Sequence, residues 1–244
     1  MSAGQPTIDN TIGSAYIGWG LSSLVFGVLC IQVWSYYQRY PRDNTAYKSL
    51  VGGLWLLELL HQVMVGHCVY SYTVTNFGNV LALAEKPVWT LSWQVFIGAL
   101  VGTIVKICFG MRVWKFSKGN YFITGTIMVL AVAQLGTALT YTLRSVKLRL
   151  IQANQLKTLG TTSLALGVAT DIVTAAALSY FLHKMRTGYA KSDTLINRLI
   201  LYSVNNGILT SACSLTVVIL YNVMPTNFIF MGLYFVLSKL YANS

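Results

Sequence analysis

The chain has 244 residues, of which 55% are hydrophobic and 9% charged, and its mean hydropathy is +0.60. This composition excludes a water-soluble enzyme, because apolar stretches such as 11–38 contain too little charge to fold in water. The net charge of +11 comes from basic residues that stand in small groups between apolar segments. That pattern predicts membrane lipids as partners, and no nucleic acid.

About 20 consecutive apolar residues are enough for a helix to cross the hydrocarbon core of a membrane. By this measure we predict one all-α domain, residues 1–244, that forms a polytopic seven-transmembrane-helix bundle. The spans are expected at about 11–37, 49–73, 88–111, 121–143, 158–182, 197–221 and 224–243. Turn residues such as Pro41, Gly119, Gly188 and Pro225 lie in the connections.

Lys and Arg are unevenly divided between the two sides of this bundle. One side holds eleven of the 17 and the other five, while Lys106 lies within the third span. The positive-inside rule then predicts an N-terminus outside or in a lumen and a cytoplasmic C-terminus. The connection 144–157 departs from this rule, because it places four basic residues on the outer side. We interpret it as a short interfacial helix.

A faint internal similarity relates spans one to three and spans five to seven. Ser35-Tyr36-Tyr37 and Thr75-Asn76-Phe77 match Ser179-Tyr180-Phe181 and Thr226-Asn227-Phe228. One interpretation is a parallel repeat around the fourth span, in a 3+1+3 plan that some transporters use. The other is that these residue types are common at membrane interfaces.

Ionisable side chains within the predicted spans are the first functional candidates, because a charge in lipid needs a partner or a water-lined cavity. Glu58 and Asp171 lie roughly 13 and 16 Å from the cytoplasmic ends of their spans, at 1.5 Å per residue. Asn205 and Asn206 lie at roughly 12 to 14 Å, in the same layer. Lys106, about five residues from the inner end of its span, is expected to reach the headgroups.

Glu58 and His61 are three residues apart and therefore share one face of a helix. They form either a hydrogen-bonded structural pair or part of a metal site. A metal site in a helical bundle needs several more acidic or histidine ligands, and Asp171 is the obvious further one. We therefore expect no metal and treat these three residues as weak metal candidates.

Asp171 stands at the centre of an otherwise apolar span. It is either a structural carboxyl bound to Asn205, Asn206 or Lys106, or an uncharged acid facing a cavity. The catalytic candidates are Glu58, His61 and Asp171. The ligand-binding candidates are Glu58, His61, Gln94, Gln134, Asp171, Asn205 and Asn206.

No sequence motif for a nucleotide, haem or retinal cofactor is present, and the cofactor is unknown. An opsin is not favoured, because Lys239 is expected near the inner end of the last span. Small-residue patches at Gly52-Gly53, Gly98–Gly102 and Ala175–Ala177 allow close helix contact and hence oligomers.

Two parts of the chain have a distinctive pattern. Within Leu54–Tyr72, an acid-x-x-His-x5-His pattern places Glu58, His61 and His67. Further matching segments are Thr170-Asp171, Arg186-Thr187-Gly188, Asp193, Ile196–Ile200, Asn206-Gly207, Leu209-Thr210-Ser211 and Ser238–Ser244. With these segments the chain resembles a large family of integral membrane proteins from mushroom-forming (basidiomycete) fungi, which carry a C-terminal membrane domain of unknown function. The resemblance implies seven helices, no established activity and a cytoplasmic tail after the final stretch. Family members often have Asp at position 58.

Three functions fit these observations. The first is a receptor or sensor that binds a small lipophilic molecule in an intramembrane cavity, and the absence of known catalytic motifs favours it. The second is a membrane-embedded enzyme that uses intramembrane acids on a lipid-soluble substrate, for example a terpenoid. The third is a small-solute or proton carrier or channel, which the polar layer and the repeat favour. Whether the protein is an enzyme stays open.

Overall fold

The computed structural model describes residues 8–77, 86–148, 155–185, 190–224 and 227–244, without the side chains of 190–193, 195 and 202. Within these ranges there are seven α-helices and no strand. They are α1 (Ser14–Arg39), α2 (Thr45–Tyr70), α3 (Trp89–Phe116), α4 (Tyr121–Ser145), α5 (Lys157–Lys184), α6 (Ala190–Val223) and α7 (Ile229–Asn243). Short π-helical turns, Asp9–Gly13 and Ser71–Thr75, extend α1 at its start and α2 at its end.

Six of these helices are long and apolar enough to cross a membrane. They are Asp9–Arg39, Thr45–Thr75, Trp89–Phe116, Tyr121–Ser145, Lys157–Lys184 and Ile196–Val223. Large apolar side chains such as Leu24, Ile31, Val63 and Val129 are exposed on the outer surface, as a bundle surrounded by lipid requires. The expectation of an all-α, multi-pass integral membrane protein is therefore confirmed, in the coarser form of six long apolar helices.

The seventh span is shorter than the expected 224–243. Its helix has 15 residues, Ile229–Asn243, which is below the length of a full crossing. The helix begins late because the preceding residues make a connection instead. Asn227 donates its backbone N–H to the carbonyl of Met224, and Phe228 donates to the carbonyl of Asn10 near the N-terminus. Pro225 lies outside the described residues.

Other helix ends follow local capping signals. The side chain of Asn44 accepts from Ala46 N and fixes the start of α2 at Thr45, four residues before the expected 49. Asn120 accepts from the backbone of the first turn of α4, which begins at Tyr121 as predicted. α3 continues to Phe116, five residues beyond the expected 111. The segment 149–154, in the connection that we interpreted as an interfacial helix, lies outside the described residues.

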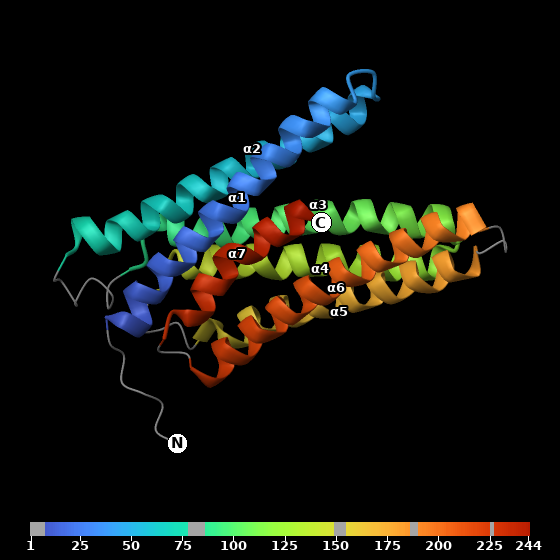
Figure 1. The fold of residues 1–244 in the computed structure, drawn as a ribbon. Coiled ribbons are helices and arrows are strands. Elements are labelled where there is room, and N and C mark those ends of the chain that lie inside the picture. Colours follow the sequence, from blue (N-terminus) through green and yellow to red (C-terminus); the bar gives the residue numbers. More distant parts are fainter. Residues whose placement is uncertain (1–7, 78–85, 149–154, 186–189, 225–226) are drawn as a thin grey trace.

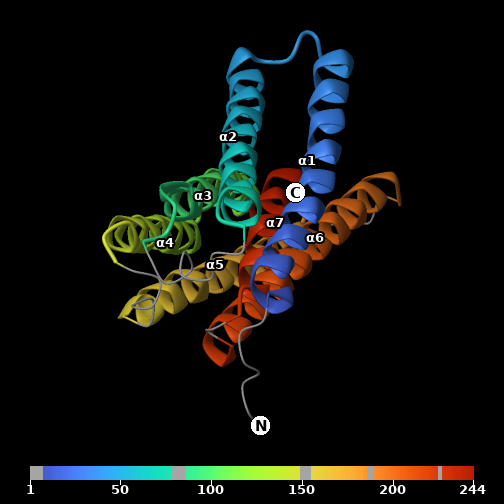
Figure 2. The ribbon, with the colours of Figure 1, turned by 90° about the vertical axis from the view of Figure 1, so that its left-hand side faces the viewer.

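The α1–α2 hairpin crosses the group of α3, α4, α5 and α6 obliquely, and α7 lies between the two parts (Figures 1 and 2). α7 packs against α1, α2, α3 and α6. Its closest approach is to α1, because a Cβ built on Gly18 would lie 2.2 Å from the Cα of Gly232. Two glycines therefore let the two backbones touch.

The end of α7 lies in the middle of the bundle rather than at its rim (Figure 1). The side chain of Asn243 donates to Val25 O near the middle of α1, at 3.4 Å. Asn206, near the middle of α6, donates to Ser244 O at 3.2 Å. As a result, the last turns of α7 carry their side chains at the depth of the polar residues on the other helices.

Candidate functional site

The interior of the bundle contains charged side chains near the midpoints of several helices. Glu58 is the fourteenth of 26 residues in α2, Lys106 the eighteenth of 28 in α3, and Asp171 the fifteenth of 28 in α5. Glu58 and His61 are 0% exposed and Asp171 is 7% exposed. The prediction that these three residues face the interior is confirmed. They belong to two separate clusters.

The first cluster joins α2 to α7, and we call it the Glu58 cluster (Glu58, His61, Ser238 and Lys239). The Nζ of Lys239 lies 2.7 Å from Glu58 Oε2 and 2.5 Å from His61 Nδ1. Ser238 Oγ donates to Glu58 Oε2 at 3.3 Å and lies 3.5 Å from His61 Nδ1. Lys239 is 0% exposed, so its ammonium has no contact with water or lipid headgroups.

The ring of His61 has a defined tautomer in this arrangement. An ammonium is a donor only, so Nδ1 accepts from Lys239 and the ring proton of a neutral imidazole is on Nε2. Glu58 and Lys239 then form an ion pair beside a neutral histidine. The expectation of a direct Glu58–His61 pair changes accordingly, because both side chains meet through Lys239 and Ser238.

Three polar atoms in and beside the Glu58 cluster are buried and make no hydrogen bond of good geometry in the described part of the chain. They are Glu58 Oε1, His61 Nε2 and Gln94 Oε1. The amide nitrogen of Gln94 donates to Leu91 O at 3.2 Å, and its side chain makes only a weak contact with His61. A buried polar atom without a partner costs about 1 to 3 kcal/mol. The cluster is therefore only partly satisfied.

α3 closes the Glu58 cluster on the side of the imidazole. A Cβ built on Gly98 would lie 3.3 Å from His61 Nε2 and 3.5 Å from Ser238 Cβ. A side chain here would crowd both neighbours, so the glycine allows α2 and α7 to pack against α3. Gln94 lies one turn before Gly98 and on the same face of α3. The Nε2 of His61 thus faces α3 and contacts the side chain of Gln94.

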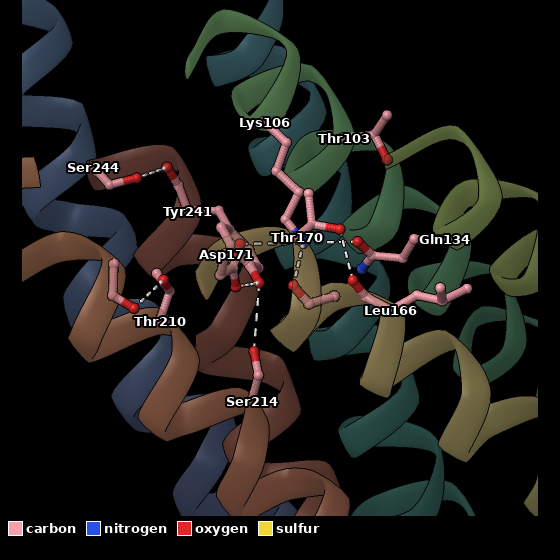
Figure 3. A network of polar contacts seen from close by, with 12 residues as sticks. Thr103, Lys106, Gln134, Leu166, Thr170, Asp171, Thr210, Ser214, Tyr241 and Ser244 are labelled. Carbon is pink, nitrogen blue, oxygen red and sulfur yellow. Dashed lines mark hydrogen bonds and ion pairs between the residues drawn. The ribbon is translucent and has the colours of Figure 1, made fainter. Parts of the chain in front are cut away.

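The second cluster joins α3, α4, α5, α6 and α7, and we call it the Lys106 cluster (Lys106, Gln134, Asp171, Ser214 and Tyr241; Figure 3). The Nζ of Lys106 lies 3.3 Å from Asp171 Oδ1 and donates to Gln134 Oε1 at 2.7 Å. It also donates to the carbonyl of Gly167 at 3.1 Å. Tyr241 OH donates to Asp171 Oδ2 at 2.6 Å and lies 3.4 Å from Ser214 Oγ.

Hydrogen bonding in the Lys106 cluster is complete. The three N–H donors of Lys106 face three acceptors, and both oxygens of Asp171 have a partner. The ammonium also lies 5.0 Å from the ring centroid of Tyr241, within the range of a cation–π contact. The structural alternative for Asp171, a bond to Lys106, is confirmed by this contact.

Two sequence-based expectations about lysines are wrong. Lys106 does not reach the headgroups: it is 2% exposed and paired with Asp171. The reason is that α3 runs to Phe116, which places Lys106 ten residues, or about 15 Å, from the helix end. Lys239 does not lie near the inner surface either, because α7 directs this side chain to Glu58 at the middle of α2.

The remaining ligand-binding candidates divide between interior and surface. Gln94 and Gln134 are 1% and 9% exposed and thus line the interior as expected. Asn206 is half-buried, but Asn205 is exposed, which contradicts its expected interior position. Neighbouring residues on a helix point about 100° apart, so only one of the two asparagines can face inward. The structure brings together Gln134 and Asp171, and separately Glu58 and His61 with Gln94 nearby.

Sequence reasoning missed Ser238, Lys239 and Tyr241 as site residues. All three are buried and each contacts a carboxylate. The sequence feature that points to them is Lys239, a lysine inside the apolar segment 229–243. The predicted span placed this lysine at the membrane surface, where it would need no buried partner.

The weak metal candidates lie in different clusters, because Glu58 and His61 contact Lys239 whereas Asp171 contacts Lys106. Among the described residues there is no group of three His, Cys, Asp or Glu side chains that could hold a metal. The space beside Glu58 and His61 is filled by an ammonium, which repels a cation.

A recess borders the Lys106 cluster between α3, α5, α6 and α7. Its lining includes Asp171, Thr174, Ser203, Asn206 and Tyr241. The volume of about 30 Å³ holds one or two water molecules, far less than a drug-sized ligand needs. A second, shallow groove follows the threonines of the first half of α5 beside Asn222. Glu58 and His61 line neither of these two spaces.

Six long apolar helices around buried charges define a multi-pass integral membrane protein. Residues 167–244 match the model of a family described as "Family of unknown function (DUF6534)", so this part of the chain is similar to an uncharacterised domain. The matched segment contains Asp171, Lys239 and Tyr241, whereas Glu58 and Lys106 lie outside it. No curated protein and no solved structure matches the chain. An origin in mushroom-forming fungi stays a prediction from the sequence resemblance.

Proposed function

We propose that the protein is a membrane carrier whose transported or coupling ion binds at the Glu58 cluster. The observation that supports this most strongly is the ion pair of Glu58 and Lys239, with 0% exposure, two sequence-distant helices and unpartnered atoms beside it. Ionisable groups at such depth typically mark ion pathways and proton relays in membrane proteins.

A purely structural role explains the Glu58 cluster less well. Apolar residues of similar volume usually replace a buried ion pair at no loss of stability. The unpartnered Glu58 Oε1 adds a further cost of about 1 to 3 kcal/mol, and His61 and Gln94 are only weakly satisfied by each other. These energetic costs indicate that the cluster has a function, and that this function uses the unpartnered Glu58 Oε1.

The two other functions have less support. A lipophilic ligand needs an enclosing cavity of about 300 Å³ or more, and the recess beside Asp171 offers about 30 Å³. The groove along α5 is larger, about 680 Å³, but it is open at the surface and none of the buried charged residues of either cluster lines it. An enzyme with intramembrane acids needs room for a substrate beside the acid, yet Glu58 is 0% exposed and the recess beside Asp171 offers about 30 Å³.

The proposed carrier has its N-terminus outside or in a lumen, and its last helix, α7, points towards the cytoplasmic side, as the charge asymmetry predicts. The 3+1+3 parallel repeat would relate α1–α3 to α5–α7 and suits a carrier. α7 would transmit ion binding at the Glu58 cluster to the Lys106 cluster, because it carries Lys239 in the first and Tyr241 in the second.

The test is charge movement in proteoliposomes adsorbed on a solid-supported membrane. Rapid exchange among solutions that differ in pH, Na⁺, K⁺ or Cl⁻ should produce a transient current for at least one of them. The matched variant is Lys239→Met, which removes the buried charge and should abolish that current. Wild-type protein that gives no current with any of these ions would sink the carrier proposal. A lipophilic molecule that co-purifies with it, seen by mass spectrometry, would then favour a binding protein.

A further inference from the structure

We infer that the ion of the Glu58 cluster is the proton, and that it binds to Glu58 Oε1. This inference rests on the proposed carrier function and names its ion. Three observations carry it: the free acceptor atom, the absence of room for a larger ion at the cluster, and the fixed ammonium of Lys239.

Glu58 Oε1 is the atom of the ion pair with vacant lone pairs. Glu58 Oε2 accepts from both Lys239 and Ser238, whereas Oε1 has no partner among the described residues. His61 Nδ1 is already occupied by Lys239. A proton that reaches the cluster therefore forms its new O–H bond at Oε1. The carboxylate becomes a neutral acid, and the charge of the cluster changes from zero to plus one.

The packing excludes other ions. Glu58, His61 and Lys239 are each 0% exposed, and neither described recess reaches Glu58 or His61. A sodium or calcium ion needs several oxygen ligands and a cavity of its own size, and the ammonium of Lys239 repels it. An anion is blocked because Glu58 and His61 cover that ammonium. A proton needs no cavity and no more than one lone pair.

The charged groups that face Glu58 and His61 come from few elements. α2 packs against α1, α3 and α7. α7 supplies Lys239 with Ser238, and α3 presents the uncharged Gln94 and Gly98. Towards α1, the next residue of α2 after His61, Gln62, accepts from Ser22 Oγ at 2.6 Å. Lys239 is thus the charge that responds when Glu58 is protonated.

Proton binding on Glu58 removes the counter-ion of Lys239. The ammonium then keeps its bond to His61 Nδ1 but lies uncompensated in a dry interior, which is strongly unfavourable. A shift of α7 that moves this charge relieves the imbalance, and α7 packs closely on α1 at Gly18 and Gly232. Protonation of a single oxygen can in this way be coupled to movement of a helix.

A route for the proton lies on the side of α3. His61 Nε2–H and Gln94 Oε1 face each other on this side of the cluster and contact each other directly, although the geometry is short of a full hydrogen bond. This contact extends the polar path from the cluster to α3.

The experiment uses the purified full chain in phosphatidylethanolamine–phosphatidylglycerol vesicles that contain a pH-sensitive dye. A potassium diffusion potential set by valinomycin drives proton entry. Wild type should acidify the vesicles, and Glu58→Gln should lose this flux, because the nearly isosteric amide cannot take up a proton. The matched control is Gln62→Met, four residues further along α2, which should keep the flux. Unchanged flux in Glu58→Gln overturns the inference.

Infrared difference spectra provide a second readout that does not depend on transport. A pH step should produce a carboxylic-acid C=O band in wild type that shifts in D₂O. The band should disappear in Glu58→Gln and persist in Asp171→Asn, which removes the other buried carboxyl. A band that follows Asp171 instead overturns the assignment. If Glu58→Gln does not fold, Glu58→Asp keeps a titratable group, and its band should persist at a shifted frequency.

The two proposals fail in different ways. Solid-supported currents with Na⁺, K⁺ or Cl⁻, without any proton flux, would overturn the proton inference and leave the carrier function standing. A lack of current with every ion, together with no proton flux, would overturn both.

Discussion

The Glu58 and Lys106 clusters contain the same kinds of charged side chains but differ in how completely these are hydrogen-bonded. Each contains a buried lysine–carboxylate pair, and α7 contributes to both. Lys106 donates to three acceptors, and both oxygens of Asp171 are used. Lys239 has two partners, and Glu58 Oε1 has none among the described residues. A complete network holds helices in place. In the proposed carrier, the incomplete one leaves Glu58 Oε1 free to take up a proton.

α7 separates the two clusters by its own geometry. Lys239 and Tyr241 are two residues apart, which places them about 200° apart around the helix axis. Lys239 therefore points to α2, and Tyr241 points to Asp171 on α5. In the proposed carrier, a movement of α7 that follows protonation of Glu58 would also disturb the bond of Tyr241 to Asp171, so the Lys106 cluster would oppose it.

The largest expected effect is the loss of stability in Lys106→Met. The substitution leaves Asp171 without its counter-ion and strands Gln134 Oε1 and Gly167 O in an apolar interior. Breaking a buried pair from one side costs about 3 to 5 kcal/mol. The measurement is the free energy of unfolding in mixed detergent micelles. A change below about 1 kcal/mol would mean that the complete network does not hold the helices together.

Lys239→Met is expected to cost less, about 2 to 3 kcal/mol. It strands two acceptor atoms, Glu58 Oε2 and His61 Nδ1, in place of three. Moreover, Glu58 can become neutral by taking a proton on its free Oε1, which removes the uncompensated charge. The same unfolding measurement decides the order. If Lys239→Met proved more destabilising than Lys106→Met, the contrast between the clusters would be wrong.

Tyr241→Phe ranks third. It removes the hydroxyl that donates to Asp171 Oδ2 at 2.6 Å and leaves the ring in place beside Lys106. Since the acceptor is charged and buried, the expected loss is about 1 to 2 kcal/mol. The control is Tyr234→Phe, because Tyr234 OH donates to a backbone carbonyl, Val95 O, and the lost bond is uncharged. Equal losses in the two variants would show that the charge of Asp171 adds nothing.

The sequence predicted the depth of the polar residues better than their partners. The apolar runs gave six spans within a few residues, and the cost of charge in lipid placed Glu58 and Asp171 in the interior. Partners depend on how helices far apart in sequence pack, which periodicity does not encode. The pairing of Glu58 with Lys239 is such a contact, between residues 181 positions apart.

Small errors at helix ends account for the two wrong lysines. Five residues at the end of α3 correspond to about 7 Å, enough to move Lys106 from the headgroup region to the bundle centre. The start of α7 at Ile229 instead of 224 changes the depth of Lys239 by a similar amount. Asn205 shows the other limit. Its depth was predicted, and Asn206 was expected to face the interior, but α6 is apolar on several sides and did not show that Asn205 faces outward.

A water-exposed counterpart of the Tyr241–Asp171 bond provides the last and smallest test. Tyr36 OH, near the end of α1, donates to Asp43 Oδ2 in the loop before α2 at 2.6 Å, the same length as the buried bond. This bond, followed by the backbone N–H of Asn44 on Oδ1, lowers the pKa of Asp43 below its usual 3.8. The stabilisation is therefore present above pH 3.8 and is lost as the pH falls through the lowered pKa of the folded state.

Tyr36→Phe should accordingly raise the pKa of Asp43 towards 3.8, with little effect on stability at neutral pH. The reason is that Asp43 is exposed, and water replaces the lost hydroxyl at almost no cost. The pKa is read from the side-chain carbon shift of Asp43 in an NMR titration, and stability from the unfolding assay used for Tyr241→Phe. If both tyrosine variants lost the same stability, burial would not be the cause of the strength of the Lys106 cluster. An unchanged pKa of Asp43 would show that the Tyr36 hydroxyl is bound to water instead.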